Sequence, residues 1–118
     1  MTYLLLISHG DAATPESDAW SRLSDEEQKA VYADYQAINQ TPGVTPGRWL
    51  EPPETATTVR VQDGKTLTTD GPFVAIKEAL GGYLFYEADD IDAAIELAAR
   101  IPAARMGGSV EVRPLKES

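Results

Sequence analysis

The sequence has no cysteine among its 118 residues. This absence excludes disulfide bonds and a thiolate nucleophile, and it fits a reducing compartment, so we expect a cytoplasmic protein. Long apolar runs are also missing, and none approaches the roughly 18–20 residues that a membrane-spanning helix requires. The apolar run at residues 3–7 is too short for the core of a signal peptide and follows no basic segment. It predicts a first β-strand in a soluble protein without a membrane partner.

Positive charge is scarce as well. Ten basic residues face 19 acidic ones, for a formal net charge of -9, and the acidic residues are spread along the chain. Nucleic-acid binding depends on clustered lysines and arginines that displace counterions from phosphates. The longest basic feature here is the pair Arg100 and Arg105. The sequence therefore excludes nucleic acid as a partner.

The length of the chain permits one hydrophobic core. The sequence contains no internal repeat and no low-complexity linker that would separate two folding units. We therefore expect a single domain over residues 1–118.

Two continuous apolar segments, at residues 3–8 and 83–86, predict strands that are buried on both faces. Two helices are also expected. Ser24 and Glu27 have the spacing of a capping box, which predicts a helix that ends within the Pro- and Gly-rich segment 39–47. Asp89 or Asp90 caps a second helix, with apolar positions at 91, 94, 95, 98 and 101, that Pro102 ends.

Residues 57–61 and 65–68 predict a β-hairpin, because Asp63-Gly64 between them tolerates the positive φ angles of a tight turn. The alternation of these strands indicates that one hairpin face is exposed to solvent. An alternating strand at residues 110–113 completes the chain. The glycine pairs at 81–82 and 107–108 lack the spacing of phosphate-binding loops, and we expect them to permit close packing at strand starts.

This order of elements predicts an α+β fold: a ferredoxin-like sheet with both helices on one face. The two helices leave the other face of the sheet uncovered, and its tyrosine and leucine side chains form a larger apolar patch than a soluble monomer usually exposes. Sheet-to-sheet packing of a second copy would cover that patch. We therefore expect a homodimer with two-fold symmetry.

Several segments carry a resemblance to a known family: residues 70–73 (Asp-Gly-Pro-Phe), 80–83, 102–105 and 107–114. The sequence resembles the YCII-related family, in particular its DGPF branch, nearly from end to end. The resemblance implies a bacterial protein that forms a dimeric α+β barrel, a His and an Asp in an acid-base site, and a link to sigma factors. This chain has Ala75 where DGPF relatives commonly carry an acidic residue.

His9 is the only histidine, and it follows the first buried strand, where a rigid sheet can present a functional side chain. A lone histidine in a loop is also common as a surface residue. Asp11 and Asp70 are its candidate partners, although each also suits a turn. If His9 and Asp70 meet, the carboxylate would fix the imidazole tautomer and make a general acid-base pair, the candidate catalytic site.

Aromatic residues are the candidates for binding a small-molecule ligand beside that pair, with core or interface packing as the alternative. They are Trp49, Phe73, Tyr83 and Phe85. The sequence has no paired histidines at metal-binding spacing, so it predicts no metal and no cofactor.

Two functions remain open. In the first, the dimer is a small enzyme that abstracts a proton from, or eliminates a group from, a small aromatic or lactone-like substrate. In the second, it is a ligand-sensing or partner-binding module without chemistry, linked by the resemblance to sigma-factor regulation.

Overall fold

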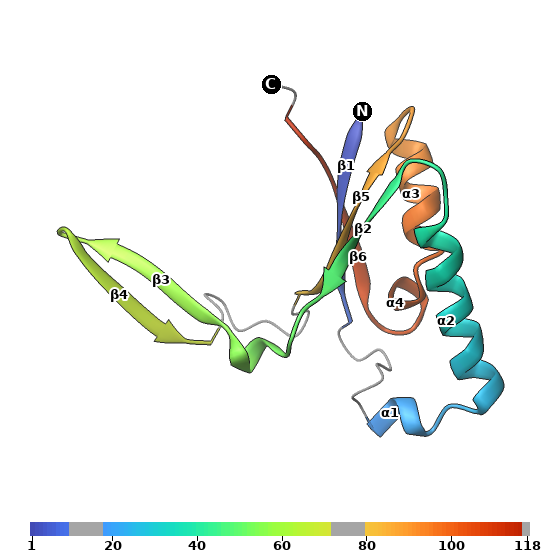
Figure 1. The fold of residues 1–118 in the computed structure, drawn as a ribbon, viewed down its shortest axis with the longest axis horizontal. Coiled ribbons are helices and arrows are strands. Elements are labelled where there is room, and N and C mark those ends of the chain that lie inside the picture. Colours follow the sequence, from blue (N-terminus) through green and yellow to red (C-terminus); the bar gives the residue numbers. More distant parts are fainter. Residues whose placement is uncertain (10–17, 72–79, 117–118) are drawn as a thin grey trace.

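The computed structural model describes residues 1–9, 18–71 and 80–116, and it consists of a layered body from which a hairpin projects (Figure 1). The elements follow in the order β1 (Thr2–Ser8), α1 (Asp18–Ser21), α2 (Asp25–Asn39), β2 (Val44–Trp49), η1 (Pro53–Thr55), β3 (Thr57–Gln62), β4 (Lys65–Asp70), β5 (Leu80–Glu87), α3 (Ile91–Ala99), α4 (Pro102–Arg105) and β6 (Ser109–Pro114).

The main sheet has four antiparallel strands in the order β2-β5-β1-β6. The two strands that read as apolar on both faces, β1 and β5, are therefore the central pair. The mixed α+β class is confirmed, and the strand order is consistent with the predicted ferredoxin-like fold.

Helix α2 begins at the predicted capping box. The Glu27 N–H donates to the Ser24 hydroxyl over 3.1 Å, and the Ser24 N–H donates to the Glu27 carboxylate over 2.9 Å. The pKa of Glu27 is held below its ordinary value, because the backbone N–H of Ser24 and, to a lesser extent, its side chain stabilise the charged carboxylate. The cap is confirmed because it depends only on residues three positions apart.

Strand β2 was not anticipated. Residues 39–47 were expected only to end the helix, but the structure places β2 from residue 44 onwards, paired with β5. Pro46 and Gly47 are unfavourable in strands, and this local signal indicated a loop. Pro46 is tolerated because β2 is an edge strand, where the missing N–H need not break an interior ladder of hydrogen bonds.

The core lies between the sheet and the helices. Tyr3, Leu5 and Ile7 alternate along β1 and are buried in one cluster with Ile38 of α2 and Leu97 of α3. Figure 1 shows α2, α3 and α4 on the same side of the sheet. The packing of side chains from elements far apart in sequence is what holds these layers together.

Helix α3 begins at one of its two predicted caps. Asp90 is the cap, and its carboxylate accepts from the Ala93 N–H over 2.9 Å. Ile91 and Ile95 are exposed, although helical spacing predicted them for the core. The predicted apolar positions Ala94, Ala98 and Ile101 do lie in the core, together with Leu97, which the predicted spacing did not include.

The opposite face of the sheet carries Leu4, Leu6, Tyr83 and Phe85, which we call the open face. Leu4 pairs with Phe85 and Leu6 with Tyr83, and residues directly opposite on antiparallel strands point to the same face. All four side chains are half-buried.

Strands β3 and β4 form a separate two-stranded sheet, the predicted hairpin. Asp63 and Gly64 have φ angles of 52° and 76°, so the tight turn between the strands is the one that this dipeptide favours. Within the described chain both faces of the hairpin are exposed, and Thr58 alone is half-buried. The expectation of a single wet face is therefore wrong for one copy of the chain, since the hairpin projects away from the body (Figure 1).

Over the described ranges, no helix has both the length and the apolar character needed to cross a bilayer.

Candidate functional site

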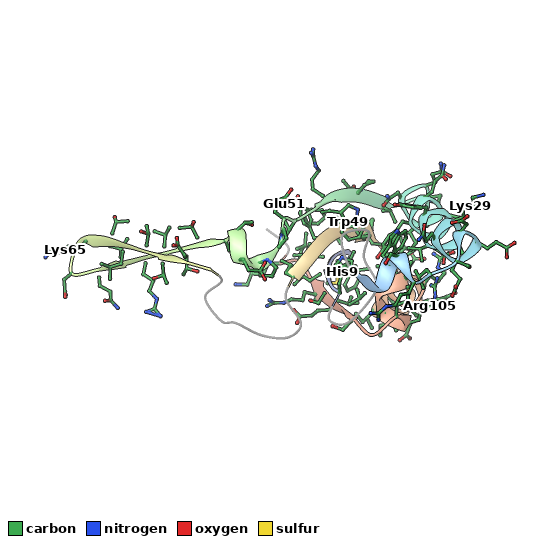
Figure 2. All side chains as sticks on the ribbon, turned by 90° about the horizontal axis from the view of Figure 1, so that it is seen from below. His9, Lys29, Trp49, Glu51, Lys65 and Arg105 are labelled. Carbon is green, nitrogen blue, oxygen red and sulfur yellow. The ribbon has the colours of Figure 1, made fainter. Side chains whose placement is uncertain are left out.

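His9 follows β1 at the end of the sheet from which the hairpin departs (Figure 2). A register irregularity between Ile7 and Ser8, opposite β5, precedes it. The imidazole lies against the indole of Trp49, with ring centroids 5.3 Å apart and planes inclined by 38°. The structure thus brings together the predicted base and one of the predicted aromatic residues, which come from β1 and β2.

The glycine pair that opens β5 makes room for both rings. A Cβ on Gly81 would lie 2.9 Å from Nε2 of His9, and a Cβ on Gly82 would lie 2.5 Å from Cε3 of Trp49. Contacts under 3.0 Å are essentially never made by a real Cβ. These glycines were expected to permit close packing, and the structure shows that what they admit is the side chains of His9 and Trp49.

Tyr35 of α2 is a second aromatic neighbour of the indole. Its ring meets that of Trp49 edge to face, with centroids 5.0 Å apart and an interplanar angle of 87°. Tyr35 was not among the predicted site residues, because its spacing from Val31 and Ile38 marks it only as part of an apolar helix stripe. Helical periodicity predicts that Tyr35 faces the core. It does not predict that Tyr35 contacts Trp49 of β2, because that contact depends on how the helix packs on the sheet.

Tyr35, Trp49 and Tyr83 line a hollow beside His9. The other lining residues are Ile7, Asn39, Gly47, Arg48 and Leu84. Its volume is about 40 Å³, which is room for a few water molecules. A larger molecule therefore has to bind at the mouth of the hollow, where Trp49 is 55% exposed.

The surroundings of His9 affect its protonation. Burial lowers its pKa from the ordinary value of 6.5, because desolvation disfavours the charged imidazolium. The imidazole is therefore neutral at pH 7 and able to accept a proton. Burial likewise raises the pKa of Tyr35 to about 12, against smaller opposing contributions from the backbone of Ala103 and the charge of Arg105. The Tyr35 hydroxyl stays protonated at neutral pH.

The other predicted catalytic residues are not joined to His9 in the described part of the chain. Asp70 is exposed, ends β4 and pairs with Thr57 of the hairpin, and no hydrogen bond or ion pair connects it with His9 among the described residues. Asp11 lies outside the described residues. The His9–Asp70 pair thus stays a prediction.

The remaining aromatic candidates have different positions. Tyr83 and Phe85 both belong to the open face, with ring centroids 6.1 Å apart, and Tyr83 also lines the hollow. Phe73 lies outside the described residues. Nowhere in ranges 1–9, 18–71 and 80–116 do three or more histidine, aspartate or glutamate side chains gather closely enough to hold a metal ion.

Comparison with known proteins connects this arrangement to a family. The model of the YCII-related domain matches residues 1–118, so the match includes the sheet, the helices and the hairpin. The sequence is also 32% identical over 120 residues to an uncharacterised protein of Rhizobium meliloti, and the alignment covers 98% of this chain and 92% of that protein. This chain therefore belongs to the YCII-related family.

Proposed function

We propose that this protein is a small acid-base enzyme of the DGPF branch, with His9 as the proton acceptor. The observation that carries the proposal is the position of the imidazole. It is half-buried, lies against Trp49 on the bare backbone of Gly81, and has a lowered pKa that keeps it neutral at pH 7. A neutral imidazole held at the edge of an aromatic surface is suited to remove a proton from a molecule stacked on that surface.

The exposed indole selects a flat, partly apolar substrate, such as a small aromatic or lactone-like molecule. His9 takes a proton from a carbon next to a carbonyl group of this molecule and becomes an imidazolium, and the electron pair of the C–H bond remains on the substrate as an enolate. The enolate either regains a proton at another carbon or expels a leaving group. Tyr35 acts as a positioning residue, because it contacts Trp49. Asp70 and Asp11 are the candidate carboxylates that orient His9.

The active form is a homodimer in which two open faces pack together as a dimeric α+β barrel. Leu4, Leu6, Tyr83 and Phe85 supply the apolar contact. A two-fold interface of this kind covers the same patch on both copies at once.

Solvent deuterium exchange tests the proposal, because removal and return of a carbon-bound proton in D₂O leaves deuterium in the substrate. We would incubate the protein with a panel of small lactones and hydroxylated aromatics and follow the loss of C–H signals by NMR. The wild type is expected to accelerate exchange in at least one compound. His9→Gln should lower that rate by about 100-fold or more, while Asp89→Asn, an exposed change, leaves it unaltered. Exchange that persists in His9→Gln would overturn the role of His9.

The small volume of the hollow favours a second candidate, a ligand-sensing or partner-binding module linked to sigma-factor regulation. Under this alternative a panel compound binds without exchange. His9→Gln then changes only its affinity, which titration of the combined fluorescence of Trp20 and Trp49 would measure.

A further inference from the structure

We infer that the β3–β4 hairpin is an arm that packs against a second copy of this chain. Its contact surface is one face of the hairpin, which we call the β-branched face. Alternation along β3 and the pairing of Val59 with Thr68 and Val61 with Thr66 place these side chains on the same side, together with Thr57. Five neighbouring positions on this face are thus β-branched and uncharged, and Asp70, which pairs with Thr57, adds one carboxylate at the end of the face away from the turn.

The β-branched face has no cover within the described chain. Val59 is 60% exposed and Val61 is 68% exposed. An isolated two-stranded hairpin is marginally stable in water, and β-branched residues gain their stability in strands by packing on a neighbour. Such a face, held away from the body, requires a partner.

The exposed apolar surface continues from the hairpin to the sheet. Six of the eleven exposed large apolar side chains in the described ranges lie on the hairpin or at its base: Trp49, Leu50, Val59, Val61, Leu67 and Leu80. Leu50 and Leu80 lie at the junction, since the Leu50 N–H donates to the carbonyl of Gly81 over 2.8 Å. Exposed apolar side chains therefore extend from the start of β5 to the hairpin, where Val59 and Val61 share the β-branched face and Leu67, paired with Arg60, lies on the other face.

The direction of the hairpin identifies the partner. Figure 1 shows the helices on one side of the main sheet and the hairpin projecting from the other side, which is the side of the open face. A second copy that packs on the open face therefore lies alongside the hairpin. By two-fold symmetry, each copy extends its hairpin toward the other.

The size of the open face supports this assignment. Four strands of about six residues span roughly 20 by 20 Å, or about 400 Å², which is about half of the roughly 800 Å² that each partner buries in a standard interface. One face of the hairpin adds about 200 Å². The open face alone is therefore smaller than a standard interface, and contact through the hairpin brings the area closer to that size.

The charge of the hairpin also favours a second copy. Residues 57–70 contain Arg60 and Lys65 against Asp63 and Asp70, so the hairpin is neutral, while the rest of the chain carries the whole net charge of -9. A neutral arm can approach an acidic copy of the same chain without the repulsion that two acidic surfaces experience.

Paired variants test the arm. Val59→Asp/Val61→Asp places two charges on the β-branched face, and Gln62→Asp/Thr69→Asp places two on the opposite hairpin face. We expect the wild type to sediment as a dimer at micromolar concentration. The first variant should weaken dimerisation by about 100-fold or more, and the control by less than about threefold. A monomeric wild type, or equal effects of the two pairs, would overturn the inference.

A second measurement locates the arm on its partner. Because the chain has no cysteine, a nitroxide can be attached to Lys65→Cys at the hairpin tip (Figure 2) and mixed with unmodified ¹⁵N-labelled protein. Broadening of amide signals in the labelled copy can only come from contact between copies. We expect broadening at a defined set of main-sheet residues. A dimer without such broadening would show that the sheets pair and the arm does not reach. Neither measurement uses His9, so the arm and the proposed chemistry can fail separately.

Discussion

The body and the hairpin of this protein both contain regular antiparallel strands, but the strands have opposite surroundings. Leu5 of β1 is fully buried between the helices and the neighbouring strands, whereas Val61 of β3 is 68% exposed. Both are apolar residues in regular antiparallel ladders. The comparison shows that strand pairing alone does not bury a side chain, since burial also requires a second layer, and only the body supplies one within the chain.

The largest effect that should separate the two regions is the loss of a core side chain. Leu5→Ala should lower the free energy of unfolding by about 2–5 kcal/mol, because it removes buried methyl groups and leaves a cavity. Val61→Ala should lower it by less than about 0.5 kcal/mol in dilute solution, where the hairpin has no partner. Urea denaturation at low protein concentration measures both. Equal losses would mean that the hairpin packs within its own chain.

Glycine replacements should give a smaller difference. Gly82→Ala forces a Cβ against the Trp49 ring, and we expect a loss of about 1–3 kcal/mol in the free energy of unfolding with a changed tryptophan fluorescence spectrum. In the hairpin, Gly64 has a positive φ but nothing within 4 Å of an added Cβ. Gly64→Asn keeps a residue that tolerates this conformation, so its cost should stay below about 1 kcal/mol. If Gly64→Asn lowered the free energy of unfolding more than Gly82→Ala does, the expected difference between hairpin and body would be wrong.

The smallest expected effect is on pH dependence. Above pH 6.5 His9 is neutral in both the folded and the unfolded chain. As the pH falls below 6.5, the unfolded chain binds a proton that the buried imidazole resists, so stability is lost on acidification. Unfolding at pH 7.5 and 5.5 should therefore show a shallower decline in His9→Gln than in the wild type. The neutral hairpin change Gln62→Ala should leave the decline unchanged. An identical decline in His9→Gln would show that the folded protein does not depress the pKa of His9.

The candidate site was predicted less completely than the fold. The pattern of residues identified His9 by its position after a buried strand, and it included Trp49 and Tyr83 among the aromatic candidates. It did not join His9 to Trp49, because the two lie 40 positions apart and meet only when β2 pairs with β5. Tyr35 was missed as a site residue for the same reason. The partnership with Asp70 stays a prediction.

The sequence by itself determined the features that depend on neighbours within a few residues. These are the capping box of Ser24 and Glu27, the Asp63-Gly64 turn, and the apolar runs that mark β1 and β5 as central strands. Only the tertiary structure decided that residues 44–49 form a strand, that the Gly81-Gly82 pair admits the rings of His9 and Trp49, and that both faces of the hairpin are exposed. A local hydrogen bond needs two residues close in sequence, whereas burial is set by which layers the whole chain brings together.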